Sequence, residues 1–289
     1  MFALSCQTLA PASAGAKPAI KRPVVLVYSL PFPKDVKETP ANLHLTLKAA
    51  NVIDIGPNKA NFPRGYYPDP KLLQIWREQG KVILRQGYFE QWAKAGAKPE
   101  LVRDSDELIT RWAASMREKG VDGIVIDEFQ PHKKADYRVW VKTLVTTRKN
   151  FPDKYIFIWV SGLDLDREMC RAVRDYADFA VMEVYLKASE YNGRPQKILA
   201  RMKQRLHNLM ERAPGIEKKT LMGLGIGGRY DDDPKVDYPA FVTEQVRLIS
   251  QDPELGKLQG LGIFAPHYID RPSMRALDKA ISKYLTPTK

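Results

Sequence analysis

The stretch "DSDELITRWAASMREKGVDGIVIDEF" (residues 104–129) contains a helix followed by a buried strand. Asp104, with Glu107 three residues later, is typical of a helix start, and apolar residues then recur every three or four positions until Gly120, which we expect to end the helix. The segment "GIVIDEF" (123–129) is a short β-branched run of the kind found in buried strands. Repetition of such helix and strand pairs predicts a parallel α/β protein.

Eight segments of this strand type are spread along the 289 residues. They are residues 24–30, 51–56, 81–89, 123–129, 155–162, 179–186, 220–227 and 260–268. Further helices are predicted at 137–149, 195–212, 238–250 and 273–285. Eight strands, each followed by a helix, predict a single (β/α)8 (TIM) barrel. A doubly wound open sheet would need a Gly-rich turn after its first strand, where this chain has the prolines of "LPFPKD" (30–35) instead.

The residues before the first strand are rich in Ala, Ser and Pro and lack periodicity. We therefore expect residues 1–22 to be a clipped export signal or a disordered linker, and residues 23–289 to form the barrel. Triplets ending at Ala14 and Ala16 resemble signal-peptidase sites, which predicts a secreted protein, periplasmic or extracellular. Lipid anchorage through Cys6 is an alternative, as is a plain disordered tail.

Composition narrows the classes of partner. The chain has a net charge of +12 and 44% hydrophobic residues, with no apolar run long enough to span a bilayer. Its basic residues are scattered and accompany no nucleic-acid-binding motif, so we expect no nucleic-acid partner. Cys6 and Cys170 cannot form a disulfide framework, and the four histidines lack ligand spacing. We expect a monomer with no metal and no cofactor.

Acidic and aromatic side chains gather at the predicted strand ends, where barrel active sites lie. The candidates are Tyr28, Asp54, Arg85, Tyr88, Glu90, Asp127, Glu128, Trp159, Glu183, Tyr185, Arg229, His267 and Tyr268. Acids on the fourth and sixth strands suit glycoside hydrolysis, which needs one carboxylic acid, one carboxylate and rings that stack on sugars. Strand alternation allows only one of Asp127 and Glu128 to face the barrel mouth, and the pattern leaves open which.

Structural roles compete with this interpretation. The strand-end acids could cap helices or pair with Arg85 or Lys187, and Trp159, Tyr28 and Tyr88 could simply fill the core. His267 could contact a ligand or serve only as a structural hydrogen-bond partner.

Three segments resemble the endo-α-1,4-polygalactosaminidase type of glycoside hydrolase, family 114. "GKVILRQGYFEQW" (80–92) is similar to that family's third strand, "VDGIVIDEF" (121–129) to its fourth and "YADFAVMEVYLKASEY" (176–191) to its sixth. The resemblance implies catalytic acids at Asp127 and Glu183. "DGIVIDEF" also resembles the family 18 chitinase strand, but Val125 and Phe129 replace an acid and the catalytic Glu, and we reject that assignment.

The sequence thus predicts a glycosidase that degrades a polysaccharide, with Asp127 and Glu183 as the reacting acids. Glu128 stands where family 114 has Asn, and a protein of net charge +12 would repel a cationic galactosaminan, so we expect a neutral or acidic glycan. Two other readings stay open. One is a non-catalytic glycan-binding barrel. The other is a phosphosugar aldolase or isomerase that uses "GLGIGG" (223–228) to hold phosphate.

Overall fold

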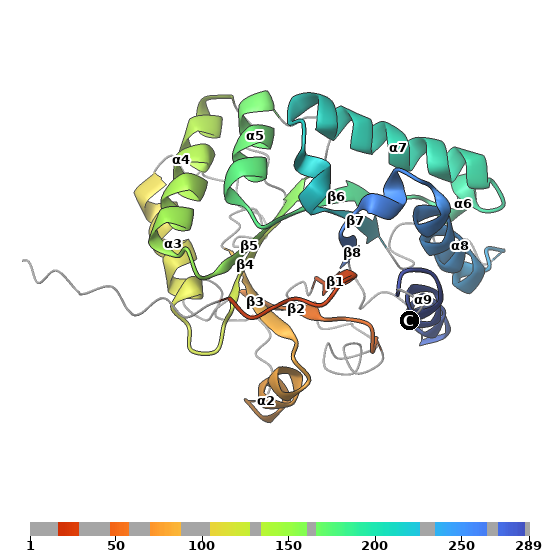
Figure 1. Cartoon of the computed structure of the whole chain (residues 1–289), viewed down its shortest axis with the longest axis horizontal. Coiled ribbons are helices and arrows are strands. Elements are labelled where there is room, and N and C mark those ends of the chain that lie inside the picture. Colours follow the sequence, from red (N-terminus) through yellow and green to blue (C-terminus); the bar gives the residue numbers. More distant parts are fainter. Residues whose placement is uncertain are drawn as a thin grey trace, which may run out of the picture.

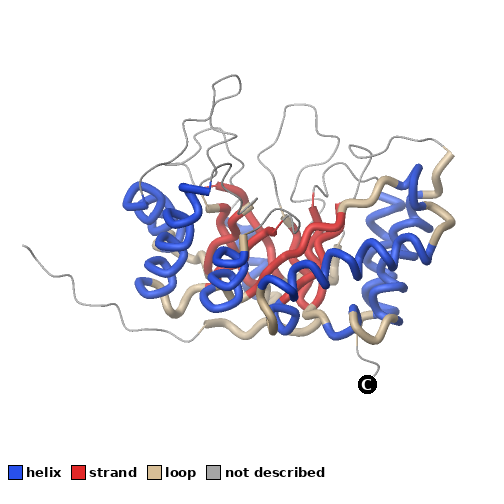
Figure 2. Tube along the Cα trace, turned by 90° about the horizontal axis from the view of Figure 1, so that it is seen from above, coloured by secondary structure: helices blue, strands red, loops and turns tan. Residues whose placement is uncertain are grey.

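The computed structural model describes residues 17–28, 47–57, 70–87, 105–127, 134–160, 166–225, 235–264 and 271–286. Eight parallel strands form a closed barrel in chain order, with β8 hydrogen-bonded to β1. Helices surround the strands, as Figures 1 and 2 show. The predicted single (β/α)8 barrel is confirmed.

Each strand begins within one residue of its predicted start. The strands are β1 (Val24–Val27), β2 (Val52–Pro57), β3 (Val82–Gln86), β4 (Gly123–Ile126), β5 (Tyr155–Val160), β6 (Phe179–Val184), β7 (Thr220–Gly225) and β8 (Gly260–Phe264). The strands β1, β3, β4 and β6 end two or three residues before the predicted end, whereas the residues that follow β5, β7 and β8 lie outside the described ranges. The β-branched run therefore marks where a strand starts better than where its pairing stops.

The helices are α2 (Pro70–Glu78), α3 (Ser105–Met116), α4 (Lys134–Asn150), α5 (Arg167–Tyr176), α6 (Ala188–Tyr191), α7 (Pro195–Arg212), α8 (Tyr238–Gln251) and α9 (Arg271–Tyr284), with short 3-10 helices η2 (Ile216–Lys219) and η3 (Leu255–Lys257). The helices α2, α5 and α6 are not among those assigned from the sequence. The helix predicted to reach Gly120 ends earlier, at Met116, because Gly120 has φ +81° and forms the turn into β4.

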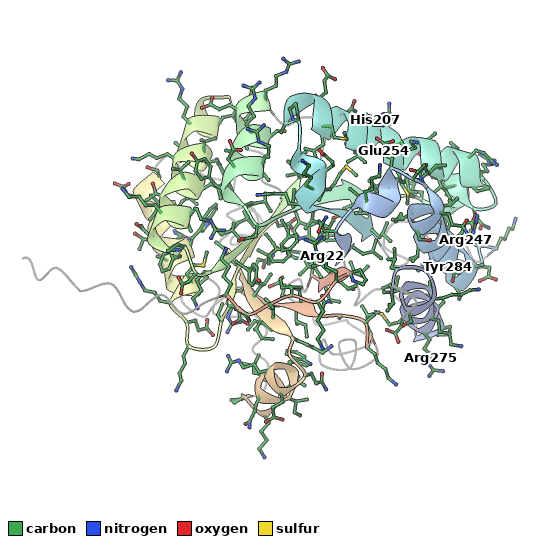
Figure 3. All side chains as sticks on the ribbon, in the orientation of Figure 1. Arg22, His207, Arg247, Glu254, Arg275 and Tyr284 are labelled. Carbon is green, nitrogen blue, oxygen red and sulfur yellow. The ribbon has the colours of Figure 1, made fainter. Side chains whose placement is uncertain are left out.

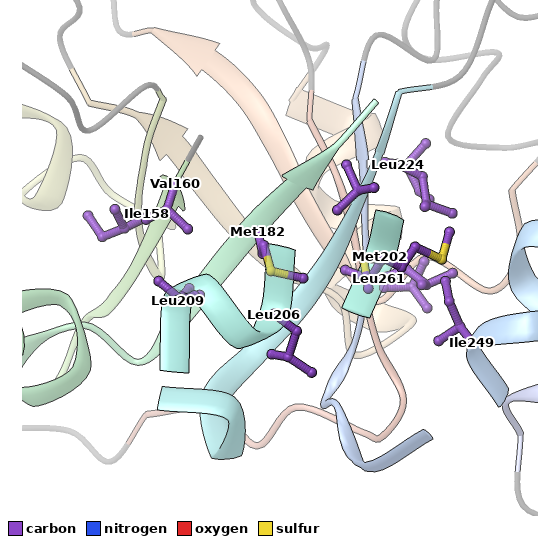
Figure 4. Packing of buried hydrophobic residues seen from close by; sticks show 14 of the residues in the cluster. Ile158, Val160, Met182, Met202, Leu206, Leu209, Leu224, Ile249 and Leu261 are labelled. Carbon is purple, nitrogen blue, oxygen red and sulfur yellow. The ribbon is translucent and has the colours of Figure 1, made fainter. Parts of the chain in front are cut away.

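Side chains on the strands alternate between the barrel interior and the helix layer. On β4, Val125 packs inside the barrel, whereas Ile124 and Ile126 pack toward the helices. Figure 4 shows the outer layer, where Met182 of β6 faces Leu206 of α7. Both faces of the strands are thus buried and apolar, as expected for a parallel barrel.

The segment before β1 crosses the N-terminal end of the barrel, here called the base. Ile20 packs against the interior cluster. The Lys17 Nζ atom lies 2.6 Å from Asp178 Oδ1, and the Tyr155 hydroxyl donates a hydrogen bond of 2.5 Å to the Pro18 carbonyl oxygen. Lys17, Pro18 and Ile20 therefore contact the base of the barrel.

The same kind of hydrogen bond holds three pairs of neighbouring strands at the base. The residue just before β2, β4 and β6 accepts a hydrogen bond of 2.8 Å from a backbone N–H at the start of the preceding strand. These contacts are Val25 N to Asn51 Oδ1, Ile83 N to Asp122 Oδ2, and Ile156 N to Asp178 Oδ2. Each side chain satisfies a buried backbone donor and so fixes the start of a strand.

Two further expectations concern membranes and thiols. None of the helices in the described ranges is long and apolar enough to cross a membrane. Cys170 is a free, buried thiol on α5, and burial raises its pKa to about 12. Cys6 lies outside the described residues. A thiol with such a pKa is protonated and unreactive at neutral pH, so Cys170 contributes only to packing in the protein interior.

Candidate active site

A cluster of aromatic rings fills the C-terminal end of the barrel, here called the mouth. Tyr28 follows β1, Trp159 lies on β5, Phe264 ends β8 and Tyr185 follows β6. The ring centroids are 5.3 Å apart for Tyr28 and Trp159, 5.7 Å for Tyr28 and Phe264, and 4.9 Å for Tyr185 and Phe264. Tyr28 and Trp159 are fully buried, so these two rings form the floor of the mouth and are not open platforms for sugar.

Glycines on β7 and β8 make room for these rings. A Cβ atom at Gly262 would lie 2.4 Å from Val181 Cγ1 and 3.1 Å from Trp159, and one at Gly223 would lie 2.9 Å from Trp159. A Cβ at Gly225 would lie 2.8 Å from the Tyr185 ring. The first two glycines of "GLGIGG" therefore have a packing role, and residues 226–228 lie outside the described ranges.

Asp127 follows β4 and lies at this floor. It is 4% exposed and continues the inward face of Val125. The Tyr28 hydroxyl is hydrogen-bonded to Asp127, and Gln86 Nε2 donates to the same hydroxyl oxygen. Because that oxygen accepts from Gln86, its own proton is directed to the Asp127 carboxylate.

Tyr28 stays a neutral donor in this arrangement. Burial raises the pKa of Tyr28 well above its usual value, and the negative charges of Asp127 and Asp54 raise it further. Asp54 is a buried residue on β2, and its Oδ1 atom accepts a hydrogen bond of 2.9 Å from the Gly56 N–H. The mouth therefore combines two buried acids with a phenol that cannot ionise near neutral pH.

Glu183 brings a third acid to the mouth from β6. It continues the inward face of Val181, pairs in register with Gly223 and is partly exposed. The strand between β4 and β6 is β5, which carries Trp159, and Trp159 is in register with Val181. Asp127 and Glu183 thus come from the two strands that flank Trp159, and Glu183 is the more accessible of the two acids.

Arg85 lies elsewhere. It shares the outward face of β3 with Ile83, and its guanidinium donates two hydrogen bonds to Glu118, of 2.8 Å from Nε and 2.5 Å from Nη2. A third hydrogen bond of 3.0 Å goes from Nη1 to the Ile55 carbonyl oxygen. Arg85 therefore joins β3 to the turn that follows α3, in the helix layer and outside the mouth. Lys187, the other expected partner of a strand-end acid, has its Nζ atom 3.9 Å from Glu190 Oε1.

Six of the predicted site residues lie outside the described ranges. These are Tyr88, Glu90, Glu128, Arg229, His267 and Tyr268. The structure also brings Gln86 and Phe264 into contact with Tyr28 at the mouth. Both follow from strand alternation, because Gln86 lies two positions after inward Leu84, and Phe264 two positions after inward Gly262.

The described residues contain no group of three or more His, Cys, Asp or Glu side chains that could hold a metal ion. Of the four histidines, His207 is described, and it lies on α7 with its Nε2 atom 2.6 Å from Glu254 Oε1 (Figure 3). This contact lies in the helix layer, away from the mouth.

Comparison with protein-family models finds no match, and comparison with curated protein sequences finds none either. Solved structures do match. The spore cortex-lytic enzyme SleL of Bacillus cereus is 13% identical with a TM-score of 0.59, over 92% of this chain and 75% of SleL. An endo-β-N-acetylglucosaminidase of Cordyceps militaris is 10% identical with a TM-score of 0.58, over 89% of this chain and 90% of that one.

A GH2 β-galacturonidase of Eisenbergiella tayi is 11% identical with a TM-score of 0.57, over 85% of this chain. This chain spans 47% of that enzyme, about half its length. At such identities the likeness concerns the fold. The chain therefore shares the TIM-barrel fold with these three proteins.

Proposed function

We propose that the protein is an exported glycoside hydrolase that cleaves glycosidic bonds of a polysaccharide, with Asp127 and Glu183 as the two reacting groups. One observation carries the proposal. Two inward acids stand at the C-terminal ends of β4 and β6, on either side of Trp159, in the part of the barrel where active sites of this fold lie. The resemblance to family 114 supports the same pair of residues.

The contacts of the two acids suggest different roles. Asp127 accepts a hydrogen bond from Tyr28, and donation to a carboxylate favours its charged form. Glu183 is the more exposed and can reach a substrate in the mouth. Glu183 is then the general acid that protonates the leaving oxygen. Asp127 is the carboxylate that attacks the anomeric carbon or activates a water molecule.

Tyr28 and Gln86 serve as positioning residues for Asp127. Gln86 donates to the Tyr28 hydroxyl, and Tyr28 in turn donates to Asp127, so the carboxylate keeps one orientation in an interior with few other polar groups. A fixed carboxylate avoids reorganisation during the reaction. The net charge of +12 supports a neutral or acidic glycan as substrate.

The test is release of reducing ends from a panel of neutral and acidic polysaccharides by the full chain. Asp127→Asn and Glu183→Gln should each lower kcat by about 10²- to 10⁴-fold. Asp153→Asn and Glu168→Gln change acids on the outer surface and should leave kcat unchanged. Full activity of both mouth variants would refute the proposal. Binding of a glycan without hydrolysis by the parent would instead support a non-catalytic glycan-binding barrel.

A further inference from the structure

Lysine side chains close three positions at the base of the barrel. Each lysine directly precedes an odd-numbered strand and donates to the carbonyl two residues before the preceding even-numbered strand. The contacts are Lys81 to Ala50 O, Lys154 to Val121 O, and Lys219 to Ala177 O, the last at 2.7 Å. The ammonium groups thus lie between the first residues of β2 and β3, of β4 and β5, and of β6 and β7. We call each such place, between the starts of an even-numbered strand and the next strand around the barrel, a wedge.

The fourth wedge, between β8 and β1, is built differently. The residue that directly precedes β1 is Pro23, which has no side-chain donor. Gln259 precedes β8, in the place where the other wedges have Asn51, Asp122 or Asp178. Its side chain is one methylene longer, and its Oε1 atom is buried without a hydrogen-bond partner. The lysine bond is thus not made in this wedge, and Gln259 does not make the bond to the preceding strand that Asn51, Asp122 and Asp178 make.

A cavity of about 260 Å³ occupies this wedge. Its apolar wall includes Ile249, Leu255, Leu258 and Leu285, and Gln259 also lines it. Arg22 and Lys257 lie on the lining as well, both exposed, and Figure 3 places Arg22 beside β1 and β8. In the described part of the chain, neither cation has an acidic partner within 4 Å.

We propose that this wedge binds a small amphipathic anion, a molecule with one carboxylate or phosphate group and a short apolar body. The anionic group pairs with Arg22 and Lys257, since the lining holds two cations and no acid. The apolar body packs on Leu255, Leu258 and the neighbouring side chains.

This site is separate from the mouth, because the cavity opens at the start of β8 and β1, whereas Asp127 and Glu183 lie at the far ends of their strands. The proposal therefore does not depend on the hydrolase activity. Asp127→Asn protein should bind the ligand as the parent does, so failure of one proposal leaves the other standing.

Calorimetric titration of the full chain with octanoate tests the site. We expect one octanoate per chain, with affinity that falls as salt is raised. Inorganic phosphate carries the charge alone and octan-1-ol the apolar body alone, so each should bind at least about tenfold more weakly. Octanol that binds as tightly as octanoate would overturn the proposed role of the cations, and no octanoate binding at millimolar concentration would overturn the site.

Two variants locate the binding. Arg22→Gln/Lys257→Gln should weaken octanoate binding about tenfold or more, and Leu285→Trp, which fills the cavity, should abolish it. Lys149→Gln/Arg171→Gln removes the same charges from the outer helices and should have no effect beyond a small change in salt dependence. Unaltered octanoate affinity in the first two variants, with native circular dichroism, would show that the ligand binds elsewhere.

Discussion

Asp122 and Asp178 at the base of the barrel and Asp127 at the mouth differ in the groups that donate hydrogen bonds to them. At the base, Asp122 and Asp178 accept hydrogen bonds from backbone N–H groups at the start of neighbouring strands. At the mouth, Asp127 accepts a hydrogen bond from the side chain of Tyr28. An acid that holds the backbone contributes to the sheet itself, whereas an acid held by another side chain can change without unpairing a strand.

Exchanging one acid at each end tests this difference most strongly. Asp127→Asn should lose activity by the factor proposed above while the free energy of unfolding changes by less than about 1 kcal/mol. Asp178→Ala should keep kcat but lose about 3 kcal/mol of stability. The loss is expected because the Ile156 N–H, Arg148 and Lys17 all lose the carboxylate that they contact. Urea unfolding and steady-state kinetics measure both quantities.

Asp175→Ala is the matched control for Asp178→Ala. Asp175 pairs with Arg174 on the surface of α5, where an ion pair contributes about 0–1 kcal/mol. Equal losses for Asp175→Ala and Asp178→Ala would show that the backbone contact at the base has no special weight.

Replacement of a glycine beneath the mouth should lower both the activity and the stability. Gly262→Ala places a methyl group 2.4 Å from Val181 Cγ1 and 3.1 Å from Trp159, which should cost about 1–3 kcal/mol and displace the floor. Near-ultraviolet circular dichroism reports the ring movement, and kcat should fall with it. Gly193→Ala meets open space but has φ +69°, so it should lower stability without altering the aromatic signal.

At alkaline pH, Tyr28 at the mouth and Tyr155 at the base should contribute differently to the pH dependence of stability. The folded-state pKa of Tyr28 lies well above the usual value, so above about pH 10 the unfolded chain loses this proton while the folded chain keeps it. Stability should then fall by up to about 1.4 kcal/mol per pH unit. Tyr28→Phe should remove this slope in urea unfolding between pH 8 and 11.

Tyr155 at the base provides the comparison. Burial raises its pKa too, but its hydroxyl is less enclosed than that of Tyr28, so Tyr155→Phe should remove a smaller slope. Identical pH dependence in the Tyr28→Phe variant and the parent would contradict the enclosure of Tyr28 at the mouth.

Asp122→Asn should give the smallest effect. Burial raises the pKa of Asp122 from its usual value, so its charge is unfavourable at neutral pH, and Asn51 makes the equivalent contact without charge. The change in unfolding free energy should be below about 1 kcal/mol, in the stabilising direction above the raised pKa, and should fade as the pH falls to the ordinary pKa of an aspartate. A large loss in urea unfolding would show that the charge itself is required at the base.

Strand positions were predictable because each strand of a parallel barrel is a short apolar run between polar turns. For the same reason, the residue pattern did not show which of Asp127 and Glu128 faces the barrel interior. Val125 faces inward and Ile124 and Ile126 face outward, and all three are apolar, so the pattern does not distinguish the faces. Only the resemblance to family 114 selected Asp127.

The residue pattern could not predict which partners Arg85 and Gln86 have, because these partners come from distant segments of the chain. Arg85 pairs with Glu118, 33 residues later, and Gln86 reaches Tyr28, 58 residues earlier. Alternation shows which face of β3 each side chain occupies, but not which element meets that face. The placement of Arg85 in the helix layer therefore required the structure.

The segment that crosses the base also bears on the order of folding. Tyr155 bonds to Pro18 across 137 residues of sequence, and Lys17 to Asp178 across 161. All four of these residues are synthesised before β7 and β8. The start of the chain can therefore be tied to the β5–β6 half of the barrel before β8 exists to pair with β1, at an entropy cost that grows only slowly with loop length. Pairing of β8 with β1 closes the barrel, but the contacts of Lys17 and Pro18 with its opposite side do not need the last strand.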